Sequence, residues 1–162
     1  MLVRIVLALV LSAGIAHAQT EKAAPAPEAA QPVISAQEAL YLVRSTLLTL
    51  NDANKSGNYT VLRDLAAPGF QAANTSASLA RTFTDLRERK FDLFGVLLIV
   101  PRFHAPPRIE DGMLRLRGAF PTMPLAIDFD LLFEKTGTTW RLFGISVHTP
   151  QAKTPGKQSP AP

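Results

Sequence analysis

Residues 113–147, MLRLRGAFPTMPLAIDFDLLFEKTGTTWRLFGISV, decide the fold of this chain. Apolar and other residues alternate along three parts of this stretch, a pattern typical of strands that bury one face. Two short breaks separate the parts, PTMP at 121–124 and KTGT at 135–138. Because connections of this length join neighbouring antiparallel strands, the stretch predicts a three-stranded antiparallel meander.

The charged side chains of the first hairpin predict its register. If Arg117 lies opposite Asp128, then Arg115 lies opposite Asp130. In this register the two arginine–aspartate pairs share one face of the sheet, and the other face is apolar. A slip by one residue would mix the two faces, so we expect the charged pairs on the outer face and the apolar residues against the core.

Helical patterns precede the meander. The segment SAQEALYLVRSTLLTLNDAN (35–54) begins with Ser35 and Glu38 in a capping-box pattern and repeats apolar residues every three or four positions. Glycine and asparagine then end this helix. A short helix is expected around Leu62, and it stops before the break at Pro68 and Gly69.

A third helix is expected to begin near Ser78, and the apolar segment FGVLLIVPRF (94–103) is predicted to form a further strand. Helices followed by a meander indicate an α+β fold. We therefore predict three N-terminal helices packed on a curved, mainly antiparallel sheet of about four strands.

The order of these segments resembles the nuclear transport factor 2-like superfamily, which has a cystatin-like fold. The resemblance rests on the cap at Ser35, the segment SGNYTVLRDLAAPGF (56–70) and the closing strand GTTWRLFGISV (137–147), and it covers residues 35–149. It implies a curved sheet wrapped around a long helix, which gives a cone-shaped domain. Members of the superfamily include isomerases, dehydratases, ligand binders and domains without activity, so the resemblance leaves the function open.

The inner sheet face is the candidate ligand site. In the predicted second hairpin, Phe133 lies opposite Trp140 and Gly144 lies opposite Phe129. Small residues opposite large ones leave space for a small apolar ligand, unless helix side chains fill the gap, as close packing of interiors favours. The predicted ligand-binding residues are Phe129, Trp140, Gly144, Ser146 and His148.

No catalytic residue is assigned. Asp128 and Asp130 face away from the predicted cavity, and a general base must reach its substrate. The sequence lacks the G-x-S-x-G, H-E-x-x-H, G-x-G-x-x-G and P-loop patterns, and we expect no cofactor or metal. We therefore expect a non-enzymatic domain that binds a small apolar ligand or a protein partner. The alternative is an isomerase, dehydratase or hydrolase that uses His148 with Ser146 or Tyr41.

The outer sheet face predicts an interface. It combines the arginine–aspartate pairs with apolar side chains, a mixture that suits a protein contact. The resemblance also implies dimerisation through this face, so a homodimer is expected. The apolar residues expected there are Met113, Leu132, Phe143, Ile145 and Val147.

The ends of the chain differ from the middle. Residues 1–18 have a positive start, an apolar run and a small-x-small site, as a cleavable signal peptide does. An Ala/Pro-rich flexible linker is expected at 19–34 and a disordered tail at 150–162. The chain has no cysteine, which excludes disulfides and a lipid-anchor cysteine. We expect a periplasmic or secreted protein without stable membrane insertion after cleavage.

The charge of the chain argues against nucleic-acid binding. The sequence has 17 basic and 13 acidic residues, and loss of Arg4 with the signal leaves a small, scattered positive excess. Nucleic-acid binding domains instead gather their cations on one face or helix.

Overall fold

The computed structural model describes residues 34–150. The predicted signal peptide (1–18), most of the predicted linker (19–34) and nearly all of the predicted tail (150–162) lie outside the described residues. Ile34, assigned to the linker from the sequence, is buried in the hydrophobic core. The folded part therefore begins slightly before the predicted boundary at 35.

The described residues contain five α-helices, one 3-10 helix and five strands. The helices are α1 (Ala36–Ser56), α2 (Thr60–Asp64), α3 (Pro68–Ala73), α4 (Ser76–Thr82), α5 (Thr84–Glu88) and the 3-10 helix η1 (Leu93–Leu97). The strands are β1 (Arg102–Phe103), β2 (Arg108–Glu110), β3 (Met113–Phe120), β4 (Ile127–Thr136) and β5 (Thr139–His148).

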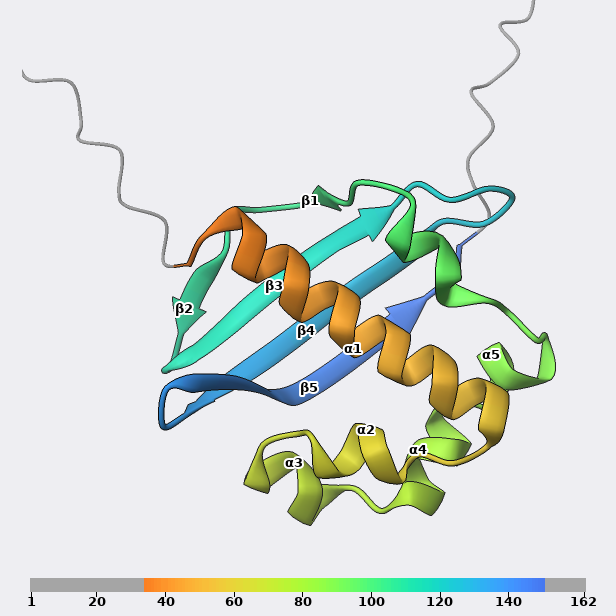
Figure 1. Cartoon of the computed structure of the whole chain (residues 1–162), viewed down its shortest axis with the longest axis horizontal. Helices are drawn as coiled ribbons and strands as arrows, with labels where there is room; N and C mark the ends of the chain where they lie inside the picture. Colours follow the sequence, from red (N-terminus) through yellow and green to blue (C-terminus); the bar gives the residue numbers. More distant parts are fainter. Residues whose placement is uncertain (1–33, 151–162) are drawn as a thin grey trace, which may run out of the picture. The chain divides into compact units, whose positions relative to one another are not determined.

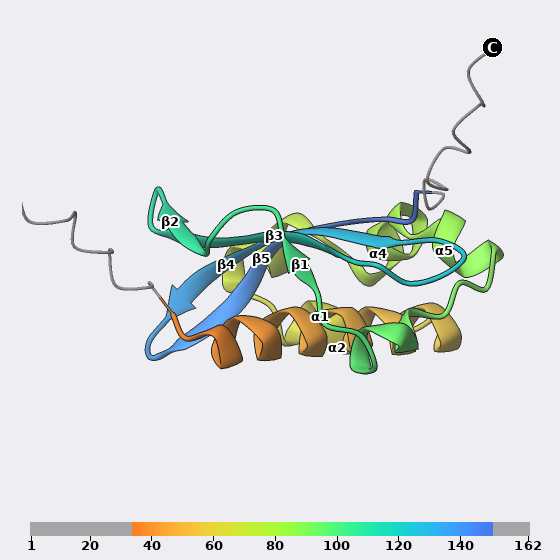
Figure 2. The ribbon, with the colours of Figure 1, turned by 90° about the horizontal axis from the view of Figure 1, so that it is seen from above.

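The fold is α+β, with one antiparallel sheet in the order β1-β3-β4-β5. Strand β2 also pairs with β3, beside β1. The predicted meander is present as β3, β4 and β5, but the helices outnumber the three expected and the sheet has one strand more. Helix α1 lies across one face of this sheet (Figures 1 and 2). Helices α2, α3 and α4 gather on the β5 side, whereas η1 lies on the other side of α1, near the end of β3 (Figure 1).

The register of the first hairpin differs from the predicted one by two residues. Arg117 lies opposite Asp130 rather than Asp128, and Leu116 lies opposite Leu131. A shift of two preserves the alternation of side chains, so the charged and apolar faces are those predicted. Leu116 and Leu131 are both buried on the face that meets α1.

The second hairpin contains a β-bulge at Phe143. Phe133 pairs with Leu142, whereas the preceding residue, Leu132, pairs with Gly144. Phe143 is therefore an extra residue in β5. One extra residue bends the strand and reverses the face to which all later side chains point.

The bulge overturns the predicted inner face of β5. Gly144 does not lie opposite Phe129, because Val147 takes that place. Trp140 lies opposite Lys135, two residues from its predicted partner. Beyond the bulge the residues that pack on the core are Ile145 and Val147, both of which the sequence placed on the outer face.

Helix α1 follows its sequence closely. The Ser35 hydroxyl accepts a hydrogen bond from the Glu38 amide at 3.0 Å, and Gly57 ends the helix with a left-handed φ of 72°. Val43 and Leu47 are fully buried, so the predicted apolar stripe faces the sheet. Helix α1 therefore packs its apolar side directly on this face of the sheet.

The segment after α5 is not the strand predicted for 94–103. The Asp92 carboxylate caps η1 by accepting a hydrogen bond from the Phe94 amide, and the Asn51 side chain accepts one from the Leu93 amide. Arg44 on α1 donates to the backbone carbonyl groups of η1 and of the turn that follows it. These contacts satisfy backbone groups that a strand would pair, so only β1 joins the sheet here.

The predicted break at Pro68 is the start of a helix. Pro68 occupies the first turn of α3, where its missing N–H costs no hydrogen bond. The amide of Ala67 donates to the carbonyl oxygen of Leu142 at 2.8 Å, which ties this region to the edge strand β5. Gly69 lies against the ring of Phe143, so α3 packs on the bulge.

Candidate functional site

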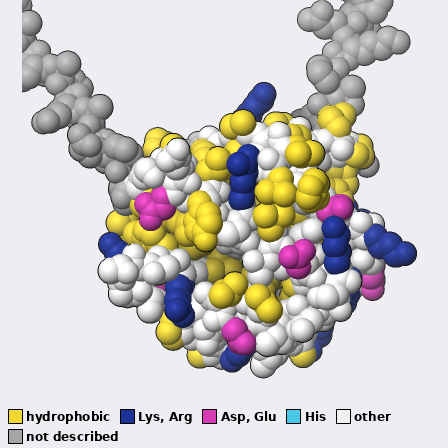
Figure 3. Space-filling view, in the orientation of Figure 1, with side chains coloured by type: hydrophobic (Ala, Val, Ile, Leu, Met, Phe, Trp, Pro, Cys, Tyr) yellow, Lys and Arg dark blue, Asp and Glu magenta, His cyan; other side chains and the backbone are white. Residues whose placement is uncertain are grey.

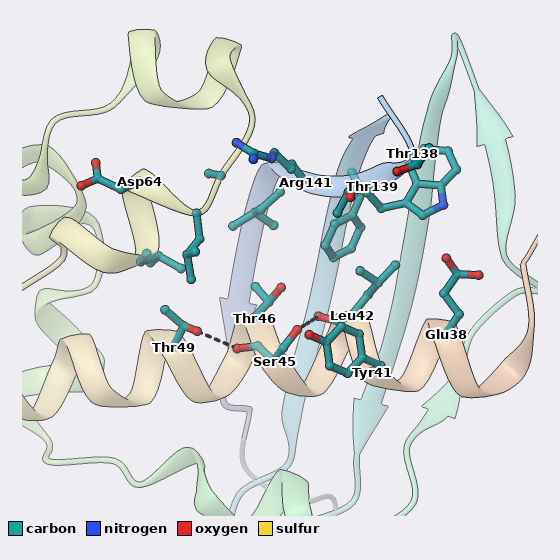
Figure 4. Close-up of a pocket in the computed structure, with 16 residues that line it drawn as sticks. Glu38, Tyr41, Leu42, Ser45, Thr46, Thr49, Asp64, Thr138, Thr139 and Arg141 are labelled. Carbon is teal, nitrogen blue, oxygen red and sulfur yellow. Dashed lines mark hydrogen bonds between the residues drawn. The ribbon is translucent and has the colours of Figure 1, made fainter. Parts of the chain in front are cut away.

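A pocket of about 430 Å³ lies between α1, α2 and the turn end of the β4–β5 hairpin, and we call it the helix–hairpin pocket (Figure 4). Its volume lies in the range of small-molecule sites in proteins. The space-filling view shows a hollow on this face of the molecule, with apolar side chains in its floor (Figure 3). Its lining residues are Glu38, Tyr41, Leu42, Ser45, Thr46, Thr49, Leu62, Asp64, Leu65, Ala66, Phe133, Thr138, Thr139, Trp140, Arg141 and Leu142.

The floor of the pocket is apolar. Leu42 on α1, Phe133 on β4 and Leu142 on β5 are buried and belong to the hydrophobic core. Trp140 is half-buried at the turn end, and the Lys135 ammonium lies 5.6 Å from the centre of its ring. The floor of the pocket therefore contains an indole and, largely enclosed beneath it, a phenyl ring.

The wall formed by α1 is polar. The hydroxyl of Ser45 donates to the Leu42 carbonyl at 3.2 Å, and that of Thr49 donates to the Ser45 carbonyl at 2.8 Å. Such bonds to the preceding turn are common for serine and threonine in helices. Because the donor of each hydroxyl is used, its oxygen remains as an acceptor for a ligand.

Charged residues stand at the ends of the pocket. Glu38 lies at the N-terminal end of α1, and Asp64 lies at the other end on α2 (Figure 4). Asp64 accepts a hydrogen bond from Arg63 at 3.0 Å. Arg141 is exposed on β5, and within residues 34–150 it forms no salt bridge. The pocket thus offers one cation and two well-separated carboxylates.

Of the five predicted ligand-binding residues, Trp140 lines this pocket. Phe129 is buried in the core instead. Its ring centre lies 5.9 Å from that of Phe103 and 5.6 Å from that of Phe120, and its ring covers Gly118 on the neighbouring strand. Phe129 therefore packs the sheet and does not face the pocket.

The other three predicted residues lie on the outer sheet face. Gly144 is opposite Leu132, Ser146 is opposite Asp130 and His148 is at the exposed end of β5. The bulge at Phe143 turns them away from α1, so they cannot line the predicted cavity mouth. The Ser146 hydroxyl and His148 Nε2 are 2.9 Å apart, and they form a hydrogen bond on the open sheet surface.

The outer sheet face carries a network of ion pairs. Arg115 binds both carboxylate oxygens of Asp130, at 2.9 and 2.7 Å, and Arg117 approaches the same carboxylate at 3.2 Å. Glu110 links Arg115 to Arg108 at the sheet edge. The hydrogen bonds from Arg115 hold the pKa of Asp130 below its usual value against the opposing effect of burial, and they raise the pKa of Arg115.

Within the described residues, no group of three histidine, cysteine or carboxylate side chains is placed to hold a metal ion. In the same part of the chain, none of the helices has both the length and the apolar character needed to cross a membrane.

Sequence reasoning missed most of the pocket. Thr46, Thr49 and Asp64 were not among the predicted site residues, and Tyr41 was named only as a possible partner of His148 in the enzymatic alternative. A detectable signal was the row of hydroxyl residues on the face of α1 that borders the apolar stripe. Arg141 gave no such signal, because its place in the pocket depends on the bend of the β4–β5 hairpin.

The comparisons with known proteins give no relative. No protein-family model matches the sequence, and neither the curated proteins nor the solved structures contain a match to it. The resemblance to the nuclear transport factor 2-like superfamily stays a prediction.

Proposed function

We propose that residues 34–150 form the binding domain of an exported protein, and that the domain holds a small amphipathic molecule in the helix–hairpin pocket without converting it. The observation that carries the proposal is the pocket of about 430 Å³ with rings in its floor and hydroxyl groups along one wall. Sites for small molecules commonly combine an apolar lining with a few polar groups that fix orientation.

The lining defines the class of ligand. A hydrocarbon or aromatic part fits against Trp140 and Phe133, and hydroxyl or carbonyl groups fit along Ser45 and Thr49. Arg141, near the turn end of β5, favours a ligand with an acidic group at that end of the pocket. The ligand is therefore an organic molecule with one apolar side, rather than the purely apolar ligand expected from the sequence.

The placement of titratable groups supports binding over catalysis. Glu38 and Asp64 lie at opposite ends of the pocket, so they do not act together on one bond (Figure 4). His148, on which the enzymatic alternative rested, lies on the outer sheet face and outside the lining of the pocket. A general acid or base must lie within hydrogen-bond reach of the reacting group.

Mass spectrometry of the denatured protein, purified natively from its host, tests this proposal. A small molecule should be released reproducibly from the wild-type protein. The Thr49→Phe variant places a ring in the pocket, whereas Asp52→Phe adds the same ring to an exposed position on the same helix. We expect the first variant to lose the molecule and the second to retain it.

The fluorescent amphipathic probe 8-anilinonaphthalene-1-sulfonate gives a second measurement, since Trp140 is the single tryptophan of the chain and lines the pocket. The affinity for the probe is measured by energy transfer from Trp140. It should fall about tenfold in Thr49→Phe and remain unchanged in Asp52→Phe. Equal affinities for the two variants, together with an empty natively purified protein, would disprove the binding role.

Export has its own test. N-terminal sequencing of the mature protein should give Gln19 as the first residue, because the predicted cleavage site follows Ala18. A mature protein that begins at Met1 would contradict it.

We propose self-association through the outer sheet face as a second role. Half-buried Met113 and Leu132 lie on this face, and no helix of residues 34–150 covers it over β3 and β4 (Figures 1 and 2). The face is more polar than predicted, because Ile145 and Val147 point to the core. Light scattering at about 50 µM should show a dimer for the wild type and a monomer for Leu132→Arg. A monomeric wild type would end this proposal.

A further inference from the structure

A second pocket, of about 460 Å³, lies at the C-terminal end of α1. We call it the α1-end pocket. It is bounded by the end of α1 and its cap, by two residues of α5 and by the chain that follows α5. The lining residues are Asn54, Lys55, Ser56, Gly57, Leu86, Arg87, Lys90, Phe91 and Asp92. It shares no lining residue with the helix–hairpin pocket.

The side of this pocket nearest the core holds a buried polar group that lacks a partner. Asn54 is only 6% exposed, and its Oδ1 accepts a hydrogen bond from the Tyr59 hydroxyl at 2.7 Å. Arg87 in turn donates to that hydroxyl at 3.3 Å. The Nδ2 of Asn54 has no hydrogen-bond acceptor within residues 34–150. The atom is itself enclosed, and a buried donor without an acceptor costs about 1–3 kcal/mol. Because Asn54 lines the pocket, a rotation of its amide group would bring this donor to an acceptor bound there.

The charge of the α1-end pocket is positive. Lys55, Arg87 and Lys90 line it, against the single carboxylate of Asp92. That carboxylate is already engaged, since one oxygen accepts from the Phe94 amide at 2.9 Å and the other pairs with Lys55 at 3.2 Å. Lys90 forms no salt bridge within the described residues, and its ammonium is free to meet an anion.

Apolar side chains complete the lining. Leu86 is buried, and Phe91 is half-buried and stacks near the Arg89 guanidinium, 5.8 Å from the ring centre. An anion alone would leave the part of the Phe91 side chain that lines the pocket without a contact. A short apolar group attached to the anion would fill the space beside Phe91.

We propose that the α1-end pocket binds a small organic anion, a carboxylate or phosphate that carries a short apolar group. The anion lies between Lys90 and Lys55 and accepts a hydrogen bond from Asn54 Nδ2, and the apolar group lies on Phe91. The proposal is independent of the helix–hairpin pocket.

The same cations have a purely structural explanation that the test must separate. The last carbonyl groups of α1 give this end of the helix a partial negative charge, which favours nearby cations. If that were their only role, removing Lys90 would change stability and would leave the binding of anions unaffected.

The experiment is a titration of the ¹⁵N-labelled full-length protein with benzoate and phenyl phosphate, followed by NMR. Benzyl alcohol serves as the neutral probe and inorganic phosphate as the anion without an apolar group. Saturable shifts are expected for the Asn54 side-chain amide and for the backbone amides of Lys90 and Phe91. Benzyl alcohol should give none of these shifts, and inorganic phosphate should bind more weakly than phenyl phosphate.

Lys90→Asn removes the charge and suits the backbone, because Lys90 has a φ of 49° and asparagine tolerates this left-handed conformation. Arg81→Gln removes an exposed positive charge outside the pocket. We expect the affinity for benzoate to fall about fivefold in Lys90→Asn and to stay unchanged in Arg81→Gln.

Three results would overturn the proposal. The first is the absence of saturable shifts at Asn54 and Lys90 for either organic anion up to about 20 mM. The second is an equal loss of affinity in Lys90→Asn and Arg81→Gln, which indicates non-specific attraction. The third is unchanged affinity in a folded Lys90→Asn variant, which leaves only the structural role at the end of α1.

Discussion

Replacing Gly118 by alanine should strongly destabilise the domain, because the close packing of β1, β3 and β4 meets at this residue. A Cβ atom at Gly118 would lie 2.5 Å from the backbone oxygen of Arg102 and 2.8 Å from Cζ of Phe129. Both distances are well inside van der Waals contact. One neighbour is backbone, so the clash cannot be relieved by turning a flexible side chain.

The size of the effect follows from what must move. Overpacking a core position costs about 1–3 kcal/mol. Moving β1 away also weakens its pairing with β3, at about 1 kcal/mol for each hydrogen bond lost. The lower unfolded-state entropy of alanine offsets about 0.5 kcal/mol. The net loss is about 2–4 kcal/mol, a large part of the stability of a domain this size.

Urea denaturation followed by circular dichroism and by the fluorescence of Trp140 measures the loss. The matched control is Gly144→Ala, in which the new Cβ meets the flexible end of Leu132 at 3.3 Å. We expect a change of about 0.5 kcal/mol or less for this control. Equal stabilities for Gly118→Ala and Gly144→Ala would refute the packing argument, as would a Gly118→Ala protein as stable as the wild type.

Two further predictions concern polar contacts, and both use Asp52, an exposed aspartate on α1, as control. The lowered pKa of Asp130 means that its pairing with Arg115 stabilises the fold above the unfolded value of about 3.9 and that this contribution is lost as pH falls through the folded pKa. Asp130→Asn should therefore remove about 1 kcal/mol at pH 7 and reduce the loss of stability that occurs as pH falls below about 4, measured by urea denaturation, and Asp52→Asn should do neither. Asn51→Ala should cost about 1–3 kcal/mol, because it leaves the buried Leu93 amide without its acceptor at 2.9 Å, and a loss no larger than that of Asp52→Ala would contradict this account.

The faces of the sheet were predictable from the sequence as far as the bulge. Arg117 and Asp130 share the outer face although their register was misplaced by two residues, because alternation of side chains has a period of two. The extra residue Phe143 interrupts this alternation in β5, and the pattern of apolar residues in the sequence gives no sign of the interruption. As a result Ser146 and His148, predicted to face the cavity, lie on the opposite surface.

The helical region was predictable where local signals act alone. Ser35 and Gly57 mark the ends of α1 by their own capping geometry. The strand predicted at 94–103 was wrong because the contacts that shape it come from far along the chain. The side chains of Asn51 and Arg44 on α1 form hydrogen bonds with the backbone of that segment. These two residues lie more than 40 positions earlier in the sequence, so a local sequence pattern does not reveal the contacts.

The hydrogen bonds of Arg44 have a consequence for how this protein can change over time. They hold the backbone of the segment through the carbonyl groups of Val96 and Ile99. The side chains of Leu98 and Val100 take no part and are 76% and 75% exposed. Substitutions at these two positions should therefore leave the path of the local chain unchanged, so this surface can acquire new contacts without refolding.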